Sequence, residues 1–197
     1  KEQSATGHGI TVHSPLKPKE IFMEHVKAAW AVDGTPVDCV KLGLEALLPV
    51  KPDLLVSGIN LGPNLGTDVL YSGTVSAAIE GLIHDIPSVA ISLNTRNNPD
   101  YKQASNHIKQ IIATIIKKGL PEECICNINI PEGIPQGYKV TSLGRRRYYN
   151  VFIKRNDPRG RPYFWMGGEP QDEVPDNLID GFITDTQAVK DGYISIT

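Results

Sequence analysis

The spacing of apolar residues along the chain alternates between short continuous runs, as in buried strands, and a helical period. This alternation predicts an α/β fold. Short apolar runs at Leu54–Val56, Ser88–Leu93 and Cys124–Ile130 are typical of buried strands in a parallel sheet. Between these runs, Thr74–Ile83 and Tyr101–Lys118 read as helices, the second strongly amphipathic. Strands that alternate with helices predict a mostly parallel sheet in a Rossmann-like, three-layer α/β/α core.

The residues before this core give a weaker pattern. Ile10–Leu16 alternates well enough to predict a short strand. Ile21–Val32 fits a helix by propensity but also fits a period of two, and we favour a strand that ends at the following Asp-Gly turn. Thr35 as N-cap, with a proline at the first helical position, then predicts a helix that runs through Leu48.

After Pro131 the helices disappear and β-rich segments follow one another, which predicts a protruding antiparallel β-hairpin. These segments are Tyr138–Leu143, Arg147–Arg155 and Tyr163–Gly167. An acidic linker is expected over Pro170–Leu178. A short helix capped by Thr184 and a last strand over Tyr193–Thr197 complete the chain.

The length and composition predict one domain over residues 1–197. We divide it into an α/β core (1–135), a hairpin extension (136–175) and a C-terminal helix and strand (176–197). The net charge of −2 gives no electrostatic reason to expect nucleic acid as a partner. No apolar run approaches the roughly 20 residues that span a bilayer, so we expect no membrane partner. Three cysteines fit a reducing cytoplasm better than a disulfide scaffold.

The loop that follows the Leu54–Val56 strand is the main candidate for a ligand site, because ligands bind at strand ends in open α/β sheets. Gly62 lets the backbone approach a ligand closely. Asn60 and Asn64 offer amide oxygens to a hard cation. Asp68 is the one carboxylate in this loop, so a metal site here requires further negative charge from elsewhere.

The helix after this loop opens with Ser72, Gly73 and Thr74, whose free N–H groups can hold an anion. The loop is not a Walker A motif or a dinucleotide fingerprint, because neither glycine pattern is present. These residues therefore predict a phosphate pocket at a strand end. Arg145–Arg147, followed by two tyrosines, leaves RNA binding as an alternative, although a subunit contact is the simpler explanation in an acidic chain.

Several segments together resemble the SurE family of survival-protein-E 5′-nucleotidases. They are KEQSATGHGITVHSPL, DGTPVDCV, KPDLLVSGINLGPNLG, DVLYSGTVSAAIEG, VAISL and ITDTQAVKDGYISIT. The resemblance covers nearly the whole chain. It implies a Rossmann-like core with a protruding hairpin, and contacts that build a homodimer or homotetramer. It also implies a metal-dependent phosphatase that acts on nucleoside 5′-monophosphates and, in some members, on short polyphosphate.

The resemblance also assigns site residues. One divalent ion, Mg²⁺ or Mn²⁺, is held in the family by an aspartate pair, a serine that matches Ser4 and an asparagine that matches Asn60. The aspartate pair has no counterpart in this sequence, and we expect it upstream of Lys1. The family's C-terminal segment is likewise expected beyond Thr197. If the chain is truly truncated, the alternative is a non-catalytic module that binds a nucleotide or phosphate.

The same assignment gives roles to the remaining candidates. Gly62 and Asn64 either touch the phosphate or shape its loop, and the helix start at Ser72–Thr74 binds the phosphate oxygens. His8 either protonates the leaving nucleoside oxygen, as a side chain with a pKa near 6.5 can, or shapes the pocket.

Overall fold

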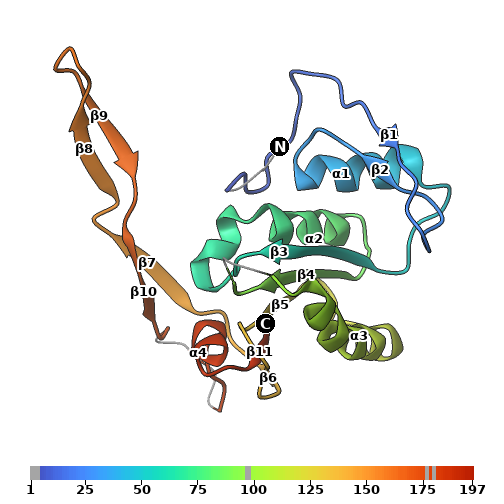
Figure 1. Ribbon diagram of the computed structural model, residues 1–197. Coiled ribbons are helices and arrows are strands. Elements are labelled where there is room, and N and C mark those ends of the chain that lie inside the picture. Colours follow the sequence, from blue (N-terminus) through green and yellow to red (C-terminus); the bar gives the residue numbers. More distant parts are fainter. Residues whose placement is uncertain (1–4, 96–98, 176–177, 179–180) are drawn as a thin grey trace.

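The computed structural model describes residues 5–95, 99–175, 178 and 181–197, and a five-stranded sheet forms its centre (Figure 1). In spatial order its strands are β3 (Leu55–Leu61), β4 (Ser88–Leu93), β5 (Cys126–Ile130), β11 (Ile194–Ile196) and β6 (Tyr138–Val140). β3, β4 and β5 are mutually parallel, whereas β11 runs antiparallel to β5 and parallel to β6. The predicted α/β class with a mostly parallel sheet is confirmed.

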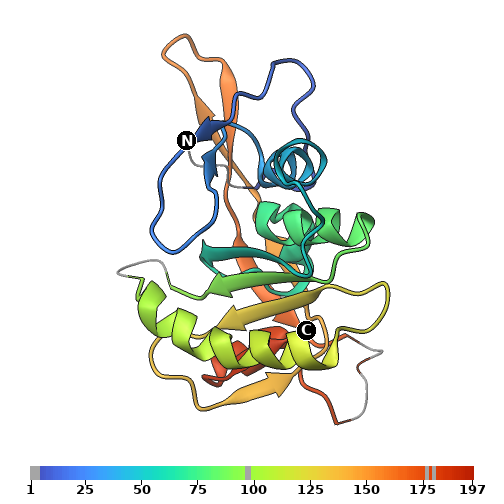
Figure 2. The same cartoon turned by 90° about the vertical axis from the view of Figure 1, so that its right-hand side faces the viewer.

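Helices cover both faces of this sheet. α2 (Gly73–Ile83) packs its small residues on one face, where Ala78 meets Ala90 of β4. α3 (Tyr101–Lys118) covers the other face, and its Ile108 joins a core cluster with Ile91; Figure 2 shows α3 on the face nearer the viewer. Successive residues of a strand point to opposite faces of the sheet. Because a helix covers each face, β4 is buried at every position. No helix among the described residues is long and apolar enough to cross a membrane.

The helix ends follow their capping residues. Thr35 and Asp38 form a capping box at the start of α1 (Pro36–Leu42), which packs on α2 and continues as a π-helical turn over Gly43–Leu47. Thr184 caps α4 (Asp185–Lys190) by accepting a hydrogen bond from the Gln187 N–H. The predicted helices and both predicted caps are confirmed.

The predictions before α1 are largely wrong. Ile10–Leu16 contains no strand, and Ile21–Val32 contributes only β2 (Trp30–Ala31), which pairs with β1 (Lys19–Glu20). Apolar side chains in this part are exposed, including Phe22 at 94%. An alternating pattern fixes a strand only when one of its faces is buried, and here neither face is.

β3 is longer than its apolar run predicted. The strand extends through Leu61, so Gly58 and Asn60 belong to it, and the register with β4 shifts between Ser57 and Asn60. The loop proper begins at Gly62, and an unpredicted 3₁₀ helix over Gly66–Tyr71 leads into α2. Glycine and asparagine obscured the end of this strand because both have low strand propensity.

An arm of two-stranded ribbons extends away from the core (Figure 1). β7 (Arg145–Tyr149) pairs with β10 (Glu169–Glu173), and β8 (Phe152–Asn156) pairs with β9 (Pro162–Met166), both antiparallel. We use "the arm" for these four strands. The predicted antiparallel hairpin is therefore present.

Two predictions around the arm are wrong. The expected acidic linker from Pro170 onward is β10 over its first residues, because Asp172 and Glu173 lie opposite Arg146 and Arg145 of β7. β6, expected in the hairpin region, instead joins the central sheet beside β11.

Candidate functional site

Asparagine side chains from β5 hold the loop after β3 against the sheet. The Asn64 N–H donates to Asn129 Oδ1 at 2.8 Å, and the Asn64 carbonyl accepts from Asn127 Nδ2 at 2.9 Å. Asn64 Nδ2 donates to Ser92 Oγ on β4 at 2.6 Å. The Asn64 side chain is buried and hydrogen-bonded inside the protein. This arrangement favours the interpretation in which Asn64 shapes the loop over one in which it touches phosphate.

Asn60 and Gly62 lie at the carboxyl end of β3. The Gly62 N–H donates to the Leu93 carbonyl at 2.9 Å, and its φ of +98° is a conformation that glycine adopts without strain. Asn60 Nδ2 donates to the Gly62 carbonyl at 2.8 Å. Within the described residues Asn60 Oδ1 has no hydrogen-bond partner, so the oxygen that a hard cation prefers is free.

The start of α2 presents open backbone N–H groups. Ser72 is the N-cap, and its hydroxyl accepts from the Val75 N–H at 3.1 Å, so that hydroxyl already has a structural role. The N–H groups of Gly73 and Thr74 belong to the first turn, which has no partners within the helix. A Cβ at Gly73 would lie 3.0 Å from Pro36 Cγ and 3.1 Å from Thr6 Oγ1, so any side chain there would require these neighbours to shift. Thr6 Oγ1 is buried and lacks a hydrogen-bond partner among the described residues.

A short N-terminal segment, residues 5–9, docks beside this helix start. The Gly7 N–H donates to the Tyr71 carbonyl at 3.0 Å, and Thr35 Oγ1 donates to the Gly9 carbonyl at 2.7 Å. His8 Nε2 lies 2.7 Å from Glu80 Oε2 of α2. Ser4, the predicted metal ligand, lies outside the described residues.

Glu80 is a buried carboxylate that sequence reasoning missed. Its side chain is 5% exposed, and Lys41 Nζ of α1 lies 3.1 Å from Oε1. Burial alone would raise the pKa of Glu80, but hydrogen bonds from His8 and Lys41, with their charges, outweigh it and hold that pKa below its ordinary value of 4.5. A signal was present, since Glu80 is the one charged residue in an otherwise small and apolar helix.

The other carboxylate of the loop region, Asp68, is already paired. Asp68 Oδ2 accepts from Arg146 Nη1 at 2.9 Å and from the Tyr148 hydroxyl at 2.8 Å. Arg146 also binds Asp172 through Nε at 2.7 Å. Asp68 therefore ties the loop to the arm, and it contributes no free charge for a metal.

The described residues offer a single candidate ligand for a metal ion. They contain no group of three or more His, Cys, Asp or Glu side chains that could hold an ion. Asn60 Oδ1 fits as a neutral ligand, because its amide is held by the nitrogen end. The described part of the chain thus offers a divalent ion one neutral oxygen.

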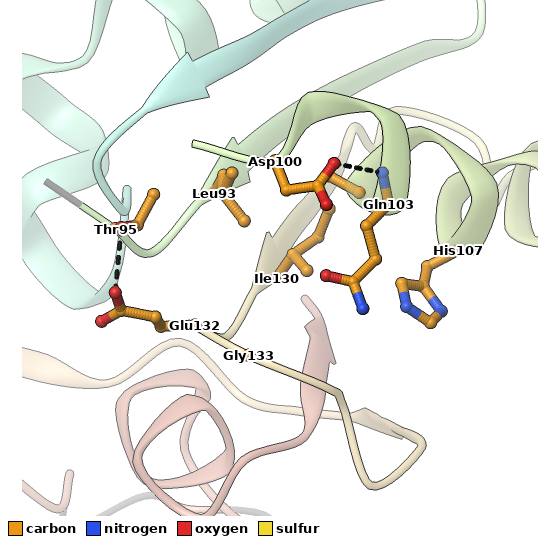
Figure 3. Close-up of a pocket in the computed structure, with 9 residues that line it drawn as sticks. Leu93, Thr95, Asp100, Gln103, His107, Ile130, Glu132 and Gly133 are labelled. Carbon is orange, nitrogen blue, oxygen red and sulfur yellow. Dashed lines mark hydrogen bonds between the residues drawn. The ribbon is translucent and has the colours of Figure 1, made fainter. Parts of the chain in front are cut away.

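A cavity of about 220 Å³ opens at the carboxyl ends of β4 and β5, beneath the start of α3 (Figure 3). Leu93 and Ile130 form its apolar floor, and Gln103 and His107 of α3 line one side. Glu132 Oε1 accepts from Thr95 Oγ1 at 3.2 Å at the opposite side. Leu93, at the end of β4, lines this cavity, and its carbonyl accepts the hydrogen bond from the Gly62 N–H. The cavity therefore begins one strand away from the β3 loop.

Comparison with known proteins decides the family. The family model "Survival protein SurE" matches residues 1–150. The chain belongs to the SurE family. A protein of Pelotomaculum thermopropionicum named 5′-nucleotidase SurE is 58% identical over 198 residues, which cover all of this chain and 74% of that protein. A protein of the same name from Desulforamulus reducens is 53% identical and matches all of this chain and 77% of its own length.

A solved structure supports the same assignment to the SurE family. The crystal structure of the SurE protein from Aquifex aeolicus is similar with a TM-score of 0.79 at 41% identity. The similarity covers 98% of this chain and 77% of that one. The Rossmann-like fold expected from the resemblance is therefore confirmed by structure as well as by sequence.

Proposed function

We propose that this SurE-family chain is a phosphatase that hydrolyses nucleoside 5′-monophosphates to nucleoside and phosphate. The observation that carries the proposal is the meeting of three features at one edge of the sheet. These are the free Asn60 oxygen, the Gly62 turn and the open N-terminus of α2. The relatives named 5′-nucleotidase SurE, matched over the whole chain, support the substrate class.

The phosphate binds at the start of α2 in this proposal. The N–H groups of Gly73 and Thr74 donate to its oxygens, and the positive end of the helix dipole adds to the attraction. Ser72 fixes the first turn as its cap, and Gly62 and Asn64 shape the adjoining loop. In the reaction a water oxygen attacks phosphorus, the bond to the 5′ oxygen breaks, and that oxygen takes up a proton.

One divalent ion, Mg²⁺ or Mn²⁺, completes the proposed site. Asn60 Oδ1 and Ser4 would hold it as neutral ligands, together with carboxylates from outside the described residues. When bound, such an ion polarises phosphate and lowers the pKa of a bound water. Short polyphosphate is a second candidate substrate, because the N–H groups of Gly73 and Thr74 would bind phosphate oxygens and would make no contact with a base.

The nucleoside extends from the phosphate into the cavity beneath α3. The apolar floor of the cavity, formed by Leu93 and Ile130, suits a flat base, and the Gln103 side chain can hydrogen-bond a base edge. The cavity adjoins the phosphate loop through the bond between Gly62 and Leu93. This placement gives a reason for a nucleotide over a smaller phosphomonoester.

The arm is the proposed contact between subunits of a homodimer or homotetramer. Phe152, Phe164 and Trp165 are each at least 58% exposed on it. We also treat residues 1–197 as one SurE-like domain in the cytoplasm, which three free cysteines support.

Phosphate release by the full-length protein tests the function. We expect nucleoside monophosphates to be hydrolysed, a chelator to abolish turnover, and Mn²⁺ or Mg²⁺ to restore it. Asn60→Ala should lower activity and raise the metal concentration required, whereas Asn106→Ala, on the exposed face of α3, should change neither. Nucleotide binding without phosphate release would overturn the proposal in favour of a binding module.

A further inference from the structure

Glu80 is a buried carboxylate. It lies on the face of α2 that packs against α1 and the N-terminal segment, with 5% of its side chain exposed. Removing a carboxylate from water is costly unless cations and hydrogen-bond donors replace the water. Its position therefore requires specific partners.

Those partners come from two other parts of the chain. His8 Nε2 reaches Oε2 at 2.7 Å from the segment 5–9, and Lys41 Nζ reaches Oε1 at 3.1 Å from α1. His84 Nδ1 lies 3.6 Å from Oε1, and Glu45 binds Lys41 and His84 from the solvent side. Each Glu80 oxygen thus has its own partner, with Lys41 facing one oxygen and His8 the other.

The pair with His8 fixes which imidazole nitrogen is available. Nε2 is engaged by Glu80, and Nδ1 has no partner among the described residues. A carboxylate that holds one nitrogen of a histidine sets the ring's tautomer and orientation, and leaves the other nitrogen to exchange protons.

The same pair anchors the segment that lies over the phosphate site. Gly7 is bonded to Tyr71 at the start of α2, and Thr6 touches Gly73 there. Glu80 lies about 10 Å further along the helix axis, at 1.5 Å per residue. The segment is therefore held at two points, and His8 is the second of them.

We propose that Glu80 is a positioning residue of the phosphatase site, which holds residues 5–9 beside the α2 N-terminus and orients His8 so that its Nδ1–H gives a proton to the leaving 5′ oxygen. In this step the P–O bond to that oxygen breaks, and the His8 ring becomes neutral while it keeps its Nε2–H toward Glu80. This inference rests on the proposed function, because it assigns a proton-transfer role within it. Lys41 balances the Glu80 charge so that the carboxylate remains ionised.

Glu80→Gln in the full-length protein tests the assignment, with adenosine 5′-monophosphate and p-nitrophenyl phosphate as substrates. The nucleoside oxygen needs a proton as it leaves, whereas p-nitrophenolate leaves without one. We expect kcat to fall about 10-fold or more for the nucleotide and much less for the aryl ester. Glu45→Gln is the matched control, since it removes a carboxylate from the same cluster that does not contact His8.

A double-mutant cycle separates positioning from general support of the fold. Glu80→Gln added to His8→Ala should lower kcat little beyond His8→Ala alone, because Glu80 acts through His8. Equal loss for both substrates, or losses that multiply, would overturn the proposal. Should Glu80→Gln fail to fold, His8→Asn at its partly exposed site must give the same substrate dependence. A wild-type protein inactive on both substrates would overturn the proposed function itself.

Discussion

β4 in the core and β9 in the arm are both short, apolar strands, and they have opposite environments. Ser88–Leu93 is buried at every position, whereas Pro162–Met166 is exposed at every position. The core strand has a helix on each face, and the arm strand has only its ribbon partner. An apolar run therefore predicts a strand, but the tertiary arrangement decides whether that strand stabilises its own chain or is free to contact another.

The largest difference should appear on removing one isoleucine from each region. Ile128→Ala empties a fully buried site on β5, in the core cluster shared with β4 and α3, and should cost about 2–5 kcal/mol of unfolding free energy. Ile153→Ala, at a 49% exposed arm site, should change the unfolding free energy by no more than about 0.5 kcal/mol. Denaturant unfolding measures both at low protein concentration. Equal losses would show that the arm is covered within its own subunit.

The arm should contribute to the association of subunits, although it contributes little to the stability of a single subunit. Phe152→Ser combined with Phe164→Ser changes two exposed residues on one face of the β8–β9 ribbon and should shift the protein to a monomer. Ile116→Ser on α3, which is 70% exposed, is the matched control and should leave the oligomer intact. Sedimentation or light scattering gives the mass. An unchanged mass in the double variant would rule out this face as the contact.

Substitutions at the junction between core and arm should lower the free energy of unfolding by an intermediate amount. Arg146 is 14% exposed and binds Asp68 and Asp172, whereas Arg147 is 56% exposed and binds Glu173. Arg146→Ala should cost about 1–3 kcal/mol because it leaves Asp68 without its cation. Arg147→Ala should cost about 0–1 kcal/mol, as exposed pairs do. Thermal unfolding compares them, and a larger effect for Arg147 would contradict this account.

The smallest effect should be a change in acid sensitivity. The pKa of Glu80 lies below its ordinary 4.5 in the folded protein, so its contribution is present above that pH and is lost as pH falls through the folded pKa. Glu80→Gln should therefore flatten the decline of stability below about pH 4.5. Unfolding curves from pH 3 to pH 6 measure the slope. An unchanged slope would mean that Glu80 has the same pKa in the folded and unfolded states.

Most of the core could be predicted from the sequence because its pattern and its environment agree. Buried strands and the amphipathic helix over Tyr101–Lys118 show the periods that their neighbours impose. The segment Ile10–Leu16 failed because it has an alternating pattern but no buried face. The linker predicted from Pro170 failed because β10 is stabilised by charges on β7, which local composition does not reveal.

The candidate site could be predicted only in part, because its supports come from distant positions. The β3 loop and the α2 start were visible as a local motif at Asn60 and Ser72–Thr74. The asparagine bonds from β5 and the link between His8 and Glu80 span about 65 and 72 residues of sequence. No local period encodes such a pair, so these supports become visible only in three dimensions.

The position of β11 in the sheet has a consequence for the order of synthesis and folding. This strand lies between β5 and β6, yet it follows the whole arm in the sequence. On the ribosome, β6 therefore emerges before the strand with which it pairs. The edge of β5 stays unpaired while the arm is synthesised. The parallel half of the sheet can form early from near neighbours, whereas the second half must close late. A nascent chain halted within the arm would expose that edge, where a chaperone or another nascent chain could bind it.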